Sequence, residues 1–301
     1  MSDKRLEGVF APIVTVFDAN EEIVLADIVS NIHYYNNTKL AGYMPLGSNG
    51  EFQGLTQTES IMVLDAICET RTEGKVIVGG CGRESVHKTV EFIRLAAAHG
   101  LNYAFVLPPH YFVSRMTDEA LYLYYMRVAD GSPAPIVIYN APKFSSGLDL
   151  SPELIARIAE HENIVAIKNS SDRPNAQYIQ ALEGKDMVVI AGNIGSFYPG
   201  LCDGAIGGVL STATYMTEYC CKLYELFMAG KRDEAEALHR WLGQLSADTI
   251  GRWGVAGVKL GLTLRGLSGG HVRLPLLDVP EAEAARIKAY FEAYPVPPAV
   301  L

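Results

Sequence analysis

The sequence predicts a single (β/α)8 barrel with extra helices at its C-terminal end. Short apolar runs rich in valine and isoleucine recur along the first 215 residues, separated by longer amphipathic stretches. Strands that are apolar throughout are buried on both faces, as in a parallel sheet covered by helices. The chain has 301 residues, a length that such barrels reach as one domain. An open, doubly wound sheet is the alternative, but its G-x-G-x-x-G fingerprint is absent after the first strand.

Eight segments are predicted to be strands. Each is a run of five to eight residues with few charges, bounded by turn residues or by an amphipathic stretch. In chain order they cover residues 10–17, 41–46, 75–80, 103–108, 135–140, 164–168, 187–192 and 204–211.

Helices are predicted between these strands. Thr56, with Glu59 three positions later, is a capping-box pattern that opens a helix over 56–73. Apolar residues at helical spacing predict a second helix over 84–99. Ser151 is followed by proline, which suits the first turn of a further helix.

The pattern changes after about residue 215. Four helices and no strong strand are predicted there, over 217–229, 231–249, 253–266 and 281–294. A barrel needs one helix after its eighth strand, so the surplus predicts a helical appendage. We expect residues 1–215 to form the barrel core, and residues 216–301 to supply its last helix and a C-terminal extension of the same unit.

Composition and charge argue against several classes of function. Hydrophobic residues make up 49% of the chain and charged residues 20%, which fits a globular protein and excludes intrinsic disorder. The formal net charge of −9 argues against a nucleic-acid-binding surface. The sequence contains no uninterrupted apolar stretch of about 18 residues, so no membrane span is expected. The charged N-terminus lacks the apolar core of a signal peptide.

The cysteines and histidines point to neither disulfides nor a metal. The five cysteines are odd in number and form no C-x-x-C pair. They are expected to be reduced, in a cytoplasmic protein. The seven histidines show no H-x-H or H-x-x-x-H pair, so neither a metal nor a metal-dependent class II aldolase is favoured.

Lys168 is the candidate nucleophile. Most of the eleven lysines lie among polar residues or near helix ends, where we expect them to be solvated. Lys168 instead ends the apolar run I-V-A-I-K, at the C-terminal face of the barrel where active sites lie. Burial there would lower the pKa of its amine, and a neutral amine can form a Schiff base with a ketone. The alternative is a strand-end lysine paired with a carboxylate.

Two further segments could complete such a site. Tyr139 ends the preceding strand, and its phenol could relay protons; the alternative is a tyrosine that only caps the barrel core. Residues 47–51 read G-S-N-G-E after the second strand, where Ser48, Asn49 and the loop amides could bind a carboxylate. The alternative is an ordinary turn in which Glu51 begins a helix.

Several motifs in one register together resemble a known family. They are G-V-F-A-P-I-V-T-V-F at 8–17, G-S-N-G-E at 47–51, Y-N-A-P at 139–142, I-K-N-S at 167–170 and R-L-P-L at 273–276. The chain resembles the dihydrodipicolinate synthase/N-acetylneuraminate lyase family of class I aldolases, over nearly its whole length. The resemblance implies a barrel enzyme of the lyase class that acts on pyruvate or a related 2-oxo acid.

The resemblance also implies roles for four residues. Lys168 would form an imine with the 2-oxo acid, and Tyr139 would relay protons. Ser48 and Asn49 would bind the carboxylate of the 2-oxo acid and complete the relay. Because the imine itself acts as the electron sink, no metal and no organic cofactor is implied.

Four more positions match the family pattern. Ser170 lies two residues after the lysine, as in the 4-hydroxy-2-oxoglutarate aldolases. Tyr111 matches the tyrosine that many members lend to a neighbouring subunit, which implies a homotetramer. Gly192 and Leu210 match positions whose backbone lines the site.

The second substrate is less narrowly defined. Dihydrodipicolinate synthases usually carry an arginine shortly after Y-N-x-P, whereas residues 143–147 read K-F-S-S-G, where Lys143 could substitute only as a point charge. Neuraminate lyases more often have threonine in place of Asn49. The G-S-N-G-E loop, G-L-D-L at 147–150 and G-V-A-G-V-K at 254–259 are most similar to 4-hydroxy-2-oxoglutarate aldolases.

Cleavage of a 4-hydroxy-2-oxo acid is therefore the first hypothesis. Dihydrodipicolinate synthase, which condenses pyruvate with aspartate semialdehyde, is the second. A sugar-acid aldolase or dehydratase, acting on a 2-keto-3-deoxy acid or N-acetylneuraminate, is the third. A non-catalytic 2-oxo acid binding protein is the alternative outside enzymes, although binding alone would not need a buried amine.

Overall fold

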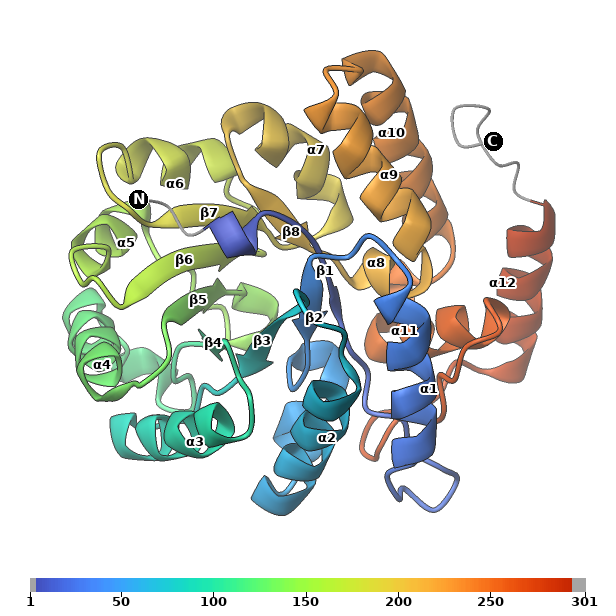
Figure 1. The fold of residues 1–301 in the computed structure, drawn as a ribbon, viewed down its shortest axis with the longest axis horizontal. Coiled ribbons are helices and arrows are strands. Elements are labelled where there is room, and N and C mark those ends of the chain that lie inside the picture. Colours follow the sequence, from blue (N-terminus) through green and yellow to red (C-terminus); the bar gives the residue numbers. More distant parts are fainter. Residues whose placement is uncertain (1–3, 294–301) are drawn as a thin grey trace.

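The fold is a closed eight-stranded parallel barrel surrounded by helices (Figure 1). The computed structural model describes residues 4–293. The strands pair in chain order, and the ring closes where Gly8 of the first strand pairs with Gly207 of the eighth. The predicted barrel is thereby confirmed, and the open doubly wound sheet is excluded.

The strands are mostly shorter than the apolar runs that predicted them. They are β1 (Gly8–Pro12), β2 (Gly42–Met44), β3 (Val76–Gly80), β4 (Tyr103–Val106), β5 (Ile136–Asn140), β6 (Ile164–Asn169), β7 (Val188–Ala191) and β8 (Gly207–Val209). The run predicted over 10–17 extends well beyond β1, yet Ile13, Val14 and Val16 are still buried. An apolar run therefore reports burial, whereas strand ends depend on backbone pairing.

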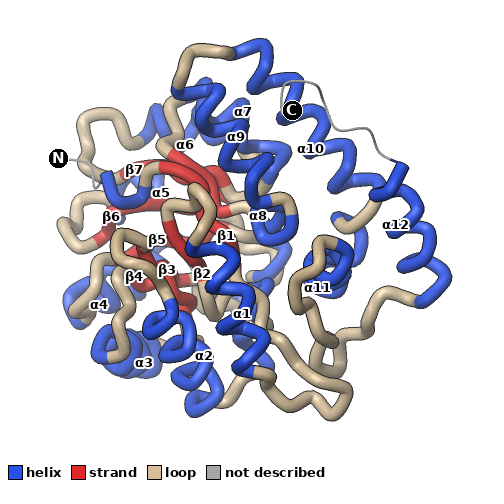
Figure 2. Tube along the Cα trace, turned by 45° about the vertical axis from the view of Figure 1, so that its right-hand side comes forward, coloured by secondary structure: helices blue, strands red, loops and turns tan. Residues whose placement is uncertain are grey.

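Helices follow the strands around the outside of the barrel (Figure 2). They are α1 (Leu25–Asn36), α2 (Gln57–Thr70), α3 (Val86–Ala98), α4 (Asp118–Gly131), α5 (Pro152–Ile158), α6 (Asn175–Ala181), α7 (Ile194–Asp203) and α8 (Ser211–Tyr215). Two predicted starts are confirmed. Thr56 and Glu59 form the capping box of α2, and the Ser151 side chain accepts a hydrogen bond from Leu154 N–H at the start of α5.

The C-terminal region is helical, as predicted. It contains α9 (Thr217–Met228), α10 (Arg232–Asp248), α11 (Gly254–Leu264) and α12 (Glu281–Ala293). The last predicted helix ran to residue 294, which lies outside the described residues. The short helix α8 was missed because five residues are too few to show a helical period; Ser211, assigned to a strand, begins it. No helix among residues 4–293 is long and apolar enough to cross a membrane.

Alternation along the strands separates two apolar cores. On β5, Ile136 and Ile138 face the surrounding helices, whereas Val137 and Tyr139 belong to the cluster inside the barrel. Ala166 of β6 lies in the same inner cluster. Because side chains alternate along a strand, Lys168 projects from β6 into the barrel beside Tyr139.

Candidate active site

Lys168 and Tyr139 are direct neighbours on two adjacent strands. They are register partners of the parallel β5–β6 pair. The Lys168 Nζ lies 4.4 Å from the centre of the Tyr139 ring and 5.3 Å from that of Phe105. The two aromatic rings are stacked, with their centres 4.4 Å apart. The amine therefore lies against a stacked pair of aromatic rings.

The surroundings of Lys168 favour its neutral form. Its side chain is buried, with 4% of the residue exposed. Burial lowers the pKa of the amine from 10.5 to about 7, and no neighbouring charge offsets this. Among residues 4–293 no carboxylate forms an ion pair with Lys168. The alternative of a strand-end lysine paired with a carboxylate is wrong, and the amine is poised as a nucleophile near neutral pH.

The pKa of Tyr139 is shifted in the opposite direction, upward. Burial raises the pKa of its phenol, and hydrogen bonds with Ser48 and Ser170 partly offset that rise. The phenol therefore keeps its proton at neutral pH. Through Ser48, it is connected by hydrogen bonding to the loop after β2. A protonated phenol beside a neutral amine is the arrangement that a proton relay needs.

The asparagines that follow these two residues hold the strand ends in place. Asn140 Nδ2 donates to Asp149 Oδ1 and to Tyr178 Oη, each at 2.9 Å. Asn169 Nδ2 donates to Asn175 Oδ1 at 3.0 Å. Asn140 and Asn169 are fully or almost fully buried, so this satisfied network fixes the backbone from which Tyr139 and Lys168 project.

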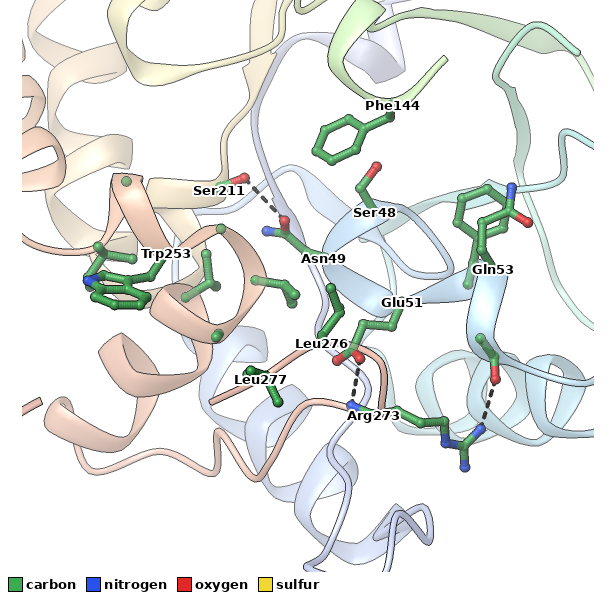
Figure 3. A pocket seen from close by; sticks show the side chains of 18 of the residues that line it. Ser48, Asn49, Glu51, Gln53, Phe144, Ser211, Trp253, Arg273, Leu276 and Leu277 are labelled. Carbon is green, nitrogen blue, oxygen red and sulfur yellow. Dashed lines mark hydrogen bonds between the residues drawn. The ribbon is translucent and has the colours of Figure 1, made fainter. Parts of the chain in front are cut away.

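The loop after β2 presents an unpaired donor. Asn49 is 9% exposed, and its Oδ1 accepts a hydrogen bond from Ser211 Oγ at 3.4 Å (Figure 3). Its Nδ2 is buried and has no hydrogen-bond partner. A buried amide donor without a partner is costly unless a ligand satisfies it. A Cβ at Gly47 would lie 2.2 Å from Met44 Cε, so any larger residue there would displace the end of that flexible side chain.

Glu51 does not begin a regular α-helix. It adopts a left-handed backbone conformation with φ of 53°. Its Oε1 lies 2.5 Å from Nζ of Lys259 on α11, and its Oε2 accepts a hydrogen bond from Arg273 N–H at 2.9 Å (Figure 3). Lys259 also donates to the carbonyl of His271. The loop is thus fastened to the C-terminal helices by a buried ion pair.

Lys259 is an exception to the expectation that most lysines are solvated. It is only 1% exposed, and burial lowers the pKa of its amine while the charge of Glu51 opposes that shift. Lys168 is therefore not the only buried lysine. The available signal was a lone charge within the apolar stretch G-V-A-G-V-K-L-G-L, which indicates a buried partner.

Ser170 and Gly192 meet at the ends of β6 and β7. Ser170 Oγ donates a hydrogen bond to Gly192 O at 3.3 Å. A Cβ on Gly192 would lie 2.0 Å from Ser170 Oγ and 2.4 Å from Asn169 O, so only glycine fits. Leu210 directly follows β8; its N–H donates to Phe10 O and its carbonyl accepts from Ala213 N–H. Its backbone polar groups are therefore used within the fold.

Tyr111 lies apart from these residues. It is 77% exposed, and its ring packs edge-on against Phe112. Its backbone N–H donates to Glu84 Oε2 at 2.9 Å. Within a single chain Tyr111 does not line the cavity beside Asn49.

A cavity of about 660 Å³ opens beside Ser48 and Asn49. We call it the mouth cavity; it lies between residues 48–54, Phe144, the start of α8, and α11 with residues 273–277 (Figure 3). Lys143 does not line it, whereas Phe144 does. In the described part of the chain, no group of three or more His, Cys, Asp or Glu could hold a metal ion.

Comparison with known proteins identifies the family of this chain. Residues 5–294 match the model of the dihydrodipicolinate synthetase family. The chain belongs to this family. Family members are class I, pyruvate-dependent aldolases and lyases, and so is this enzyme.

Relatives with different named activities match this chain with similar sequence identity and coverage. The chain is 31% identical to L-threo-3-deoxy-hexylosonate aldolase of Hypocrea jecorina, over 93% of each chain. It is 30% identical to a probable mitochondrial 4-hydroxy-2-oxoglutarate aldolase of Emericella nidulans, over 94% of this chain and 93% of that one. A crystal structure of dihydrodipicolinate synthase DapA-2 from Bacillus anthracis superposes with a TM-score of 0.90 at 25% identity, covering 98% of this chain and all of that one.

Proposed function

We propose that this enzyme cleaves a 4-hydroxy-2-oxo acid, such as 4-hydroxy-2-oxoglutarate, into pyruvate and an aldehyde through an imine on Lys168. One observation carries the proposal: the Lys168 amine is buried, unpaired and in contact with the Tyr139 ring. An amine held neutral beside a protonated phenol is suited to attack a ketone. A protein that only bound 2-oxo acids would gain nothing from such an amine.

In the first half of the reaction the substrate becomes attached to Lys168. The amine attacks the C2 carbonyl, and the carbinolamine that forms loses water to give an iminium ion. Tyr139 and Ser48, linked by a hydrogen bond, deliver the proton that leaves with this water. The Asn49 amide, which has an unsatisfied Nδ2, binds the carboxylate at C1.

In the second half the carbon–carbon bond breaks. Tyr139 removes the proton of the C4 hydroxyl, the C3–C4 electron pair moves to the iminium, and the aldehyde leaves. The resulting enamine is protonated at C3, and water hydrolyses the imine to release pyruvate and free Lys168. Electrons and protons balance within this sequence, so the two halves need no external oxidant or reductant.

The mouth of the site favours cleavage over condensation with aspartate semialdehyde. Dihydrodipicolinate synthases usually supply an arginine as a bidentate partner for the carboxylate of that second substrate. Because 4-hydroxy-2-oxoglutarate also carries a second carboxylate, the missing arginine counts against the synthase as a departure from its family pattern and not through charge alone. Phe144, and not a cation, lines the mouth cavity after β5, and Lys143 is not among the lining residues. Relatives named as aldolases of 2-oxo acids support the same choice.

We further propose that the enzyme is a cytoplasmic homotetramer in which Tyr111 completes the proton relay of a neighbouring subunit. Exposure of Tyr111 and Phe112, at 77% and 66%, supports this, because large apolar side chains gathered on a surface mark an interface. Sedimentation velocity on the active enzyme tests it. A fully active monomer would rule it out.

Borohydride trapping tests the proposed function. The enzyme is reduced in the presence of pyruvate, digested and mapped by mass spectrometry. One pyruvate-derived mass is expected on the peptide that contains Lys168, and none on Lys168→Arg, whose guanidinium stays protonated. Lys39→Arg, a change at an exposed lysine, is the matched control and should be trapped as the wild type is. Labelling of a different lysine would refute the assignment.

A further inference from the structure

The turn at residues 47–51 depends on other elements for its placement. Its own backbone closes through hydrogen bonds from Gly50 N–H to Gly47 O at 3.0 Å and from Glu51 N–H to Ser48 O at 3.2 Å. Both partners of each bond belong to the turn. Such bonds fix its shape, whereas its orientation relative to the barrel depends on contacts with residues outside it.

Two buried contacts supply that orientation. Thr15, which follows β1, donates from Oγ1 to Gly50 O at 2.7 Å. The Glu51 carboxylate is the second contact, because it lies against Lys259 Nζ and accepts from Arg273 N–H. Thr15, Glu51 and Lys259 are 1%, 7% and 1% exposed. Water therefore has little access to compete for either contact.

The Lys259 end of the second contact is itself firmly held. Lys259 lies in the middle of α11, and its amine also donates to the carbonyl of His271. Two residues earlier, Gly257 packs so tightly that a Cβ would lie 2.4 Å from Ile250 O. Because closely packed elements have little room to shift, α11 provides a fixed point for the Lys259 amine.

Stability alone does not explain this arrangement. Glu51 adopts a left-handed backbone conformation, which is unfavourable for a residue with a side chain and persists only where the surrounding structure imposes it. Burial also removes water from both charges, and apolar residues of similar volume are often as stable as a buried ion pair. What the pair does for its neighbours in the turn is therefore the better explanation.

Those neighbours are the residues that the proposed function assigns to the substrate carboxylate. Asn49 Oδ1 accepts from Ser211 Oγ at 3.4 Å (Figure 3), and within residues 4–293 its buried Nδ2 has no partner. Ser48 forms a hydrogen bond with the Tyr139 phenol. A displaced turn would move the carboxylate donor and the relay contact together, because only one residue separates Asn49 from Glu51.

Resting on the proposed function, we propose that Lys259 is a positioning residue that acts through Glu51. It holds the turn so that Asn49 Nδ2 and Ser48 Oγ face the carboxylate of the 2-oxo acid. Hydrogen bonds weaken steeply with distance and misalignment, so a released turn binds the acid less tightly. The pKa of Lys168 depends on burial and should not change when the turn is released.

A double variant separates positioning from stability. Glu51→Gln/Lys259→Met removes both charges with little change in size, and the glutamine can still accept from Arg273 N–H. It leaves no buried charge alone, so it should unfold at a higher urea concentration than Glu51→Gln. Borohydride trapping on Lys168 is then measured against pyruvate concentration and pH. The half-saturating pyruvate concentration should rise about tenfold or more, while the pH midpoint of trapping keeps its wild-type value.

Two further variants complete the test. Glu51→Asp keeps the charge and cannot overpack, so it serves even if the double variant does not fold. Its carboxylate is one methylene shorter, and the half-saturating pyruvate concentration should rise about threefold or more. Glu225→Gln/Lys39→Met removes an exposed ion pair away from the turn and should change neither quantity.

Three outcomes are decisive. An unchanged half-saturating pyruvate concentration in either folded Glu51 variant overturns the inference, as does a shifted pH midpoint, which would mean that the surroundings of Lys168 are disturbed. If pyruvate is not trapped on Lys168 of the wild type, the proposed function itself fails. If it is trapped equally well in the wild type and the variants, the proposed function stands and only the positioning role of Lys259 is wrong.

Discussion

The lowered pKa of Lys168 predicts a specific dependence of imine formation on pH. Burial places the pKa of this amine at about 7 in the folded enzyme, against 10.5 for an ordinary lysine. At pH 7 about half of the amines are then neutral, whereas about one in 3,000 would be neutral with a pKa of 10.5. The buried site thus supplies about 1,500 times more nucleophile at this pH. The rate of imine formation should rise with pH up to about 7 and then level off.

The same shift predicts a change in stability. Between pH 7 and 10.5 the unfolded chain binds one proton at Lys168 that the folded chain does not bind. The free energy of unfolding therefore rises with pH across this window, by about 1.4 kcal/mol per pH unit and about 5 kcal/mol in all. Below pH 7 the Lys168 amine is protonated in both the folded and the unfolded chain. The free-energy cost of burying its charge is then fully present and does not change with pH. In Lys168→Met this contribution is absent.

Two measurements check these values. Stopped-reaction borohydride trapping with pyruvate, from pH 5 to 10, gives the rate of imine formation. Urea denaturation of the wild type and Lys168→Met, from pH 6 to 10, gives the difference in unfolding free energy, in which titrations common to both proteins cancel. The advantage of the methionine variant should shrink by about 1.4 kcal/mol per unit above pH 7.

A different result would refute the reasoning. A trapping rate that keeps increasing tenfold per pH unit up to pH 10 would mean that Lys168 titrates as a solvated lysine. A stability difference independent of pH between 7 and 10 would lead to the same conclusion. Either result would show that water or an unrecognised anion reaches the amine.

Three substitutions probe the rest of the site. Tyr139→Phe should keep the fold and lower kcat by about 10²–10⁴-fold, because the ring still packs while the proton relay is lost. Gly192→Ala should destabilise the enzyme by about 1–3 kcal/mol and raise KM for the 2-oxo acid, because its Cβ would collide with Ser170 Oγ. Glu51→Gln should cost about 3–5 kcal/mol in urea denaturation, because it leaves the buried Lys259 without its carboxylate.

Matched controls distinguish these effects from general damage. Tyr122→Phe changes a tyrosine on α4 and should keep wild-type kcat. Gly243→Ala adds a Cβ that meets nothing within 4 Å and should not destabilise. Glu225→Gln removes a partner from an exposed pair with Lys39 and should cost no more than about 1 kcal/mol. If a control variant is as damaged as its partner, the corresponding contact is not the cause.

The sequence alone determined the barrel and the position of Lys168 at its C-terminal face. Both follow from local information, because apolar runs with helical stretches between them predict parallel βα units. The C-terminal ends of such strands all meet at one face of the barrel. Lys168 and Tyr139 end adjacent strands, so their proximity follows once the strand order is known, and the structure pairs them directly.

Only the tertiary structure decided how the loop at 47–51 is held and what the mouth cavity offers. Glu51 and Lys259 are far apart in the chain, and although the apolar stretch around Lys259 indicates a buried partner, nothing local identifies that partner as Glu51. Phe144 and Leu276 likewise come together only at the rim of the folded enzyme. Contacts between distant segments depend on how whole helices pack against the barrel, and a local pattern of residues does not specify that packing.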